Sequence, residues 1–159
     1  TWAECERIGR LLADESLRII GPAAWLRSPA VKNHSTMVRF PVGNDVIWQV
    51  VQLSPLKYPS RADRTIEVRV NLVDLGNAQI LTIPGEALPN IGFYLKRKMR
   101  GEHNFLFGLT NDAFGYILTK VDFNSFPRYQ YISRVSLGEM TGEIYIRSAL
   151  DLINAAAKK

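Results

Sequence analysis

One stretch of this sequence concentrates residue types that can do chemistry. It covers residues 78–116 and reads AQILTIPGEALPNIGFYLKRKMRGEHNFLFGLTNDAFGY. Glu86 follows an apolar run that is typical of a buried strand, and Tyr116 follows a second apolar run and a turn. Strand ends are where α/β proteins place ligands and catalytic groups. We therefore expect a site that contains Glu86 and Tyr116.

Each of these two residues also has a purely structural interpretation. Glu86 would be a first-turn acid, stabilised by the dipole and free amides of the helix expected after it. Tyr116 would be a tyrosine packed in a sheet, as aromatic strand preference predicts. The functional alternatives are a metal ligand or general base for Glu86, and a coordinating or donating phenol for Tyr116. The residue types alone favour the structural interpretations.

The composition limits the metal and redox chemistry that this chain can support. With 159 residues it is expected to be a single domain with a real core. Cys5 is the only cysteine, which excludes an internal disulfide and a cysteine metal site. His34 and His103 are the only histidines, so this chain alone cannot build a three-histidine zinc site. We expect both histidines to lie exposed in turns.

The net charge of the chain and the absence of common sequence motifs support few of the common protein functions. A net charge of +5 permits contact with acidic partners. The sequence carries no GxGxxG, P-loop, HExxH or GxSxG motif and no nucleic-acid-binding signature. Its apolar runs are far shorter than the roughly 20 residues of a transmembrane segment, and no signal peptide is visible, so the compartment stays open. One hypothesis is therefore a non-catalytic α/β module that binds a partner or acidic surface through its basic face.

Hydrophobic periodicity predicts an α/β or α+β fold, in which a mixed β-sheet is layered with helices and both chain ends are helical. Helices are expected at residues 2–20, 87–99 and 143–158, and strands at 36–42, 45–53, 65–73, 78–83, 104–109 and 114–118. The turn signal at Gly43-Asn44 predicts a hairpin from the first two strands. Residues 119–142 are expected to be irregular.

Two motifs in the stretch resemble the neutral/alkaline ceramidase family. The first is Ile83-Pro84-Gly85-Glu86, followed by Gly92 and Leu95-Lys96-Arg97. The second is Gly108-Leu109-Thr110-Asn111, followed by Tyr116-Ile117-Leu118-Thr119. They resemble the family's PGE turn with its helix, and its GL-[ST]-N segment that ends in a tyrosine. The resemblance covers residues 78–138.

The resemblance implies a zinc-dependent amidase that hydrolyses the amide bond of ceramide. In that family the glutamate of PGE and the tyrosine after GL-[ST]-N are zinc ligands, which makes Glu86 and Tyr116 candidate ligands here. A further family tyrosine near the site corresponds to Tyr131, with Tyr129 as a competing match, so Tyr131 is the catalytic candidate. Zinc would lower the pKa of bound water and polarise the amide carbonyl.

The sequence departs from the family pattern upstream of the PGE turn. The family's zinc-binding histidines and active-site serine lie there, and residues 1–83 contain no match to either. One explanation is that the chain is the C-terminal portion of a larger ceramidase-like catalytic domain, with the histidines on the N-terminal remainder of the same protein. The other is a degenerate relative without activity. We expect the isolated chain to be inactive, zinc to bind only with histidines from outside, and the substrate to be a lipid amide.

Overall fold

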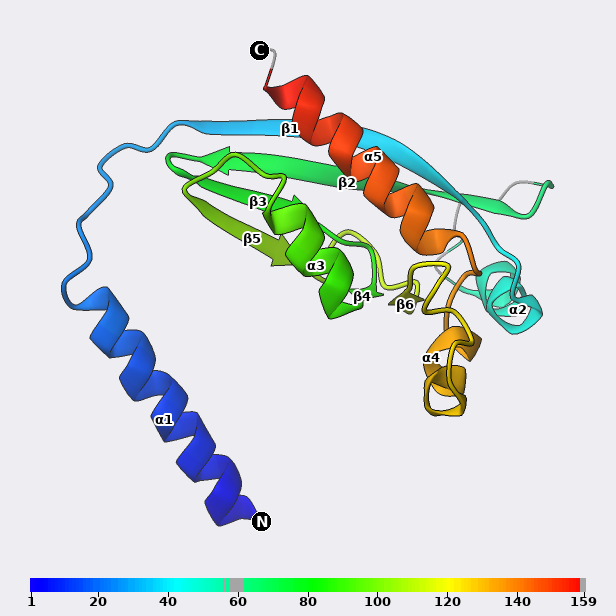
Figure 1. The fold of residues 1–159 in the computed structure, drawn as a ribbon, viewed down its shortest axis with the longest axis horizontal. Coiled ribbons are helices and arrows are strands. Elements are labelled where there is room, and N and C mark those ends of the chain that lie inside the picture. Colours follow the sequence, from blue (N-terminus) through cyan, green and yellow to red (C-terminus); the bar gives the residue numbers. More distant parts are fainter. Residues whose placement is uncertain (56, 58–61, 158–159) are drawn as a thin grey trace.

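The computed structural model describes residues 1–55, 57 and 62–157 and shows a mixed α+β fold with helices at both ends, as predicted (Figure 1). In chain order the elements are α1 (Trp2–Ile20), β1 (Val31–Pro41), α2 (Asp45–Leu53), β2 (Thr65–Leu75), β3 (Ala78–Thr82), β4 (Glu86–Ala87), α3 (Pro89–Lys96), β5 (His103–Phe107), β6 (Tyr116–Ile117), the 3-10 turn η1 (Pro127–Tyr129), α4 (Gln130–Arg134) and α5 (Thr141–Ala156). Residue 158, where the last helix was expected to end, lies outside the described residues. None of the helices in these ranges has the length and hydropathy of a transmembrane segment.

The main sheet has the strand order β1-β2-β3-β5. β1 pairs with β2 and β2 with β3 in antiparallel fashion, whereas β3 and β5 are parallel. The parallel pair is joined through α3, because parallel neighbours need a crossover connection. Helices α3 and α5 lie over the same face of this sheet (Figure 1). β4 and β6 form a separate two-stranded parallel sheet.

The core lies between the main sheet and the two helices that cover it. Every second residue of β2 from Ile66 to Leu72 is buried, which confirms the alternation predicted for residues 65–73. The buried side chains include Val38, Phe40, Ile66, Val68, Val70 and Leu72 from the strands, Ile91 and Leu95 from α3, and Tyr145, Ala149, Leu152 and Ile153 from α5.

The predicted hairpin of residues 36–42 and 45–53 is wrong, because the second segment is helix α2. Asn44 caps this helix through its side-chain oxygen, which accepts hydrogen bonds from the backbone N–H groups of Val46 and Ile47 at 3.0 and 3.2 Å. Val51 faces the core and is buried, and the Arg64 guanidinium lies 5.5 Å from the Trp48 ring centroid. β1 pairs instead with the later strand β2 over its full length.

Three other local predictions are corrected in whole or in part. His34 lies on β1 rather than in a turn, where it is largely buried with its Nε2 atom 3.2 Å from Oδ2 of Asp74. His103 is exposed as predicted, but it begins β5. Residues 119–142 are irregular only in part, because they contain η1 and α4.

A buried tyrosine ties α5 to the sheet. Tyr145 is fully buried, and its hydroxyl donates a 2.9 Å hydrogen bond to the backbone carbonyl of Thr82 at the end of β3. Burial raises the pKa of the Tyr145 phenol well above its usual value, because the phenolate would be poorly solvated there.

This burial predicts a loss of stability in alkali that depends on Tyr145. Above pH of about 10 the unfolded chain releases the phenolic proton while the folded chain keeps it, so the free energy of unfolding falls as pH rises. Tyr145→Phe should remove this part of the fall. It should also cost about 1–2 kcal/mol at neutral pH, because the Thr82 carbonyl loses its donor.

Urea unfolding between pH 7 and 11 measures both effects. Tyr94→Phe is the control, because it removes a phenol hydroxyl from an exposed side chain on α3 rather than from the core. An alkaline fall of equal steepness in wild type and Tyr145→Phe would contradict the prediction.

Candidate functional site

The structure brings Glu86 and Tyr116 side by side. They occupy neighbouring strands, β4 and β6, which pair in parallel with Glu86 directly opposite Tyr116 and Ala87 opposite Ile117. Residues in register on adjacent parallel strands direct their side chains to the same side of the sheet. The carboxylate and the phenol therefore share one side of this small sheet.

Backbone hydrogen bonds join the two sequence motifs into one unit. The N–H of Glu86 donates to the carbonyl of Gly115 at 2.9 Å, and the N–H of Leu109 donates to the carbonyl of Gly85 at 3.0 Å. The PGE turn is thus bonded to both ends of the segment that runs from the second motif to Tyr116. This network explains why the two segments form a common site although a helix and a strand separate them in sequence.

Two glycines make this close backbone approach possible. Gly115 has a φ of +85°, and a Cβ atom there would lie 2.2 Å from the carbonyl oxygen of Val135. That same oxygen accepts a 2.7 Å hydrogen bond from the N–H of Tyr116. A Cβ atom on Gly85 would lie 2.3 Å from the carbonyl oxygen of Gly115. Side chains at either position would therefore push β4, β6 and the Val135 segment apart.

The interpretation of Glu86 as a first-turn helix acid is wrong. Helix α3 begins at Pro89 rather than at residue 87, and Leu88 is its N-cap residue. Glu86 lies earlier, on β4, where its side chain is exposed. Stabilisation by the first turn of a helix therefore does not account for an acid at this position.

The Glu86 carboxylate raises the pKa of the half-buried Tyr116 phenol, because a nearby negative charge disfavours a phenolate. Partial burial and the neighbouring Tyr131 raise it further. The phenol is therefore neutral at neutral pH. A cation held by both oxygens would oppose the Glu86 charge and favour the phenolate, so this donor pair fits the oxygen side of a metal site.

Tyr131 also lies at this site. It projects from α4, its side chain is 65% exposed, and its ring meets that of Tyr116 edge-on, with centroids 6.0 Å apart and planes at 71°. The structure thus places all three candidate residues together, while the catalytic role of Tyr131 stays a prediction. The side chain of its competitor Tyr129 is outside what the structure describes.

The described part of the chain offers no nitrogen ligand near Glu86 and Tyr116 from its two histidines. His34 faces Asp74 on the main sheet, and His103 lies 3.8 Å from Glu102. Within the described ranges, no group of three or more histidines, cysteines or acids is arranged to hold a metal ion. A metal ion at Glu86 and Tyr116 would therefore need further ligands from outside the described part of this chain.

An apolar cavity of about 330 Å³ lies beside Glu86. Its walls come from α2, from the segment before Tyr116 and from the segment after α4, and are formed by Ile47, Val50, Val51, Leu109, Ala113, Phe114, Gly115 and Val135. Among the described residues that line it, Glu86 is the one with a charged side chain. Sequence reasoning missed the α2 wall because it predicted a strand there, although Asn44 followed by Asp45 is a recognisable helix start.

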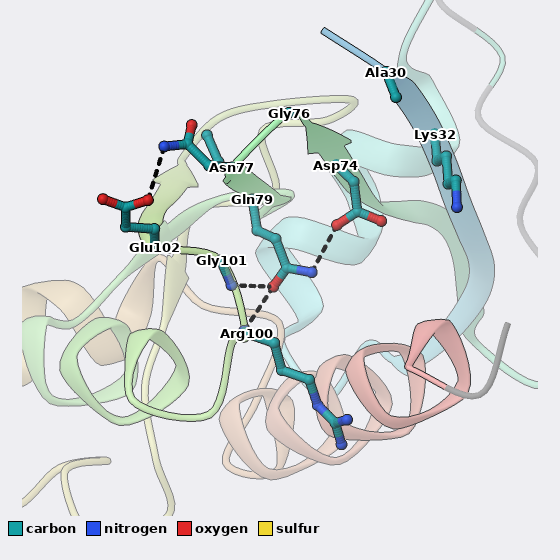
Figure 2. Close-up of a pocket in the computed structure, with 10 residues that line it drawn as sticks. Ala30, Lys32, Asp74, Gly76, Asn77, Gln79, Arg100, Gly101 and Glu102 are labelled. Carbon is teal, nitrogen blue, oxygen red and sulfur yellow. Dashed lines mark hydrogen bonds between the residues drawn. The ribbon is translucent and has the colours of Figure 1, made fainter. Parts of the chain in front are cut away.

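A second, polar cleft of about 480 Å³ lies at the other end of the main sheet (Figure 2). Gln79 lies at its centre, where its amide donates to Asp74 at 2.6 Å and accepts from the N–H of Arg100 at 2.8 Å. Lys32 and Arg100 bring positive charge to the cleft, and Asp74 and Glu102 bring an equal negative charge. The cleft therefore carries no excess of either sign.

Comparison with solved structures shows a likeness of fold to ceramidases. A ceramidase complexed with C2 matches with a TM-score of 0.51 and 19% identity over 58% of this chain. A neutral ceramidase from Pseudomonas aeruginosa matches with a TM-score of 0.56 and 12% identity over 81% of this chain. The chain spans 15% and 29% of the length of these two proteins. No sequence-family model and no curated protein matches it. The fold is therefore ceramidase-like.

Proposed function

We propose that this chain is the C-terminal portion of a larger, zinc-dependent amidohydrolase that resembles ceramidase and cleaves a lipid N-acyl amide. The observation that carries this proposal is the in-register pairing of Glu86 with Tyr116 by two motif segments that hydrogen-bond to each other. The ceramidase-like fold supports it.

Each residue of the site has a proposed role. Glu86 and Tyr116 would hold the zinc through oxygen, and histidines on the remainder of the protein would complete the site. When bound, zinc supplies a water of lowered pKa and polarises the carbonyl of the amide. Tyr131, which packs edge-on against Tyr116, is the proposed catalytic residue that contacts the amide.

The cavity beside Glu86 suits the apolar part of such a substrate. Its lining is apolar apart from the Glu86 carboxylate, and its volume is within the range of small-molecule pockets. An alkyl or acyl chain placed there would have its amide near the Glu86 end. Glu86 would then lie between the polar reacting group and the apolar chain.

The test is hydrolysis of an N-acyl lipid, first by the purified 159-residue chain and then by the protein with its remaining polypeptide. We expect no turnover by the chain alone. With the remainder present, we expect hydrolysis that a chelator abolishes and added zinc restores. Turnover by the chain alone, or hydrolysis that resists chelation, would contradict the proposal.

The alternative of a non-catalytic module with a basic binding face rests on the net charge of +5. The polar cleft does not favour it, because Asp74 and Glu102 balance Lys32 and Arg100 there (Figure 2). The metal-dependent hydrolase is therefore the function that the geometry supports best.

A further inference from the structure

The Asn44 side chain joins two helices that border the candidate site, α2 and α4 (Figure 1). Its oxygen accepts hydrogen bonds from the backbone N–H groups of Val46 and Ile47 and so caps the start of α2. Its amide nitrogen donates to the backbone carbonyls of Arg134 and Ser136 at 2.7 and 3.2 Å. Arg134 is the last residue of α4, where carbonyls lack partners within the helix. One side chain therefore satisfies the start of α2 and the end of α4.

Val135 lies between the two carbonyls that Asn44 holds, and it connects them to the site. Its carbonyl oxygen accepts the 2.7 Å hydrogen bond from the N–H of Tyr116, and its side chain lines the apolar cavity. Its N–H donates to the carbonyl of Tyr131 at 3.1 Å, and the Tyr131 ring packs against that of Tyr116. The segment that Asn44 holds therefore supports a candidate zinc ligand, the candidate catalytic tyrosine and part of the cavity wall.

The backbone of residues 134–137 depends on Asn44 and its neighbour for its hydrogen bonds. Each of the four carbonyls accepts one, and three of these bonds come from Gly43 and Asn44, with the Gly43 N–H donating to Leu137 at 2.8 Å. Ser136 and Leu137 are buried, so a carbonyl that lost its donor there would be left unpaired away from water. The segment would have to shift to recover a partner.

A second part of the cavity wall depends on the same side chain. Helix α2 contributes Ile47, Val50 and Val51 to the lining, and its Asn44 cap fixes where this helix begins. Asn44 therefore sets the position of α2 relative to Val135, which lines the cavity from the other segment. Asn44 is absent from the described lining of the cavity, so it acts through these neighbours.

We propose that Asn44 is a positioning residue of the candidate site. Through Val135 it fixes the backbone of Tyr116 and the ring of Tyr131, and it holds α2 and Val135 at the separation that accommodates the apolar chain of the substrate. The effect on substrate rests on the proposed function, whereas the effect on the two tyrosines does not.

Two substitutions separate the positioning role of Asn44 from its role as a helix cap. Asn44→Ser keeps a good N-cap residue for α2, but its shorter side chain has one hydroxyl donor in place of the two amide donors. Asn44→Asp also keeps the cap and the shape, and its carboxylate has no donor for either carbonyl. Asn104→Ser is the matched control, because the Asn104 amide also donates to a backbone carbonyl, that of Lys96 at 3.3 Å. Asn104 pairs with Gln79, in the polar cleft away from the site.

Nuclear magnetic resonance of the 159-residue chain tests the effect on the tyrosines. In Asn44→Ser and Asn44→Asp we expect the ring-to-ring Overhauser signal of Tyr116 and Tyr131 to fall at least threefold. Hydrogen exchange of the Tyr116 N–H should accelerate about tenfold, while the N–H groups of α2 keep their protection. Asn104→Ser should change neither signal. An unchanged ring signal and unchanged Tyr116 exchange in both Asn44 variants would overturn the proposal. So would loss of protection throughout the chain in both, which would show a role in folding and not in positioning.

Hydrolysis by the protein with its remaining polypeptide tests the effect on substrate. We compare two amides of the same amine, one with a dodecanoyl chain and one with an acetyl group that is too short to fill the cavity. In Asn44→Ser, kcat/KM for the dodecanoyl amide should fall about tenfold further than kcat/KM for the acetyl amide, and Asn104→Ser should leave their ratio unchanged. An unchanged ratio in Asn44→Ser would overturn the role in the cavity. If the wild-type protein cleaves neither amide, the proposed function fails, and the resonance experiment still decides the role of Asn44.

Discussion

Gly115→Ala is expected to dismantle the Glu86–Tyr116 site and to lower the free energy of unfolding by about 3 kcal/mol or more. The φ of +85° at this position costs a residue with a Cβ atom about 1–2 kcal/mol. The added Cβ would also lie 2.2 Å from the backbone carbonyl oxygen of Val135, which cannot rotate away as a side chain would. Relief of this contact must break the hydrogen bond from the Tyr116 N–H to that oxygen.

Two measurements check this expectation. Urea unfolding reports the loss of stability, and the ultraviolet titration of tyrosine shows whether the pKa of Tyr116 returns toward its usual value as Glu86 and Tyr116 separate. Gly43→Ala is the control, because a Cβ atom there would meet its nearest neighbour at 3.6 Å, an ordinary contact. Equal stability of Gly115→Ala and Gly43→Ala would contradict the account of the close backbone approach.

Glu86→Gln is expected to have the largest effect on zinc binding and activity. In the protein with its remaining polypeptide, loss of this carboxylate should weaken zinc binding by about 100-fold or more, since even supporting residues of metal sites cost 10–100-fold. Tyr116→Phe should weaken it in the same direction. Activity should fall in parallel and should recover partly at high zinc concentration.

The same substitution has a readout in the isolated chain that does not depend on zinc. The Glu86 carboxylate is the main cause of the raised pKa of Tyr116, so Glu86→Gln should lower that pKa, and phenolate should appear at lower pH. Glu102→Gln is the matched control, because Glu102 is an exposed acid at the other end of the main sheet. An unchanged tyrosine titration in Glu86→Gln would show that the two side chains do not interact.

The parts of the fold that the sequence predicted well depend on local patterns. The alternation in β2 is strict, so its buried face follows directly from the side-chain period of a strand. The helix predicted at residues 2–20 is α1, and Thr1 caps it, because its hydroxyl accepts from the N–H of Glu4 at 3.3 Å. A site that contains both Glu86 and Tyr116 could also be predicted from the sequence, because each residue follows an apolar run and a turn.

The parts that the sequence did not predict depend on contacts between distant residues. Residues 45–53 are rich in valine and apolar on most sides, so their periodicity does not distinguish a strand from a helix. These residues form a helix that the Asn44 side chain caps. The same side chain donates hydrogen bonds to the backbone carbonyls of Arg134 and Ser136 at 2.7 and 3.2 Å. The contact between Gly115 and Val135 also joins residues that are distant in sequence, and no local sequence pattern predicts it.

The position of a bound zinc ion tests the central claim most directly. Crystals of the protein with its remaining polypeptide, grown with zinc, would show that position by anomalous scattering at the zinc edge. We predict an ion about 2.0–2.2 Å from a Glu86 carboxylate oxygen and from the Tyr116 phenolic oxygen, with histidine nitrogens completing the site. Zinc bound elsewhere, with Glu86 and Tyr116 both free of it, would contradict the account.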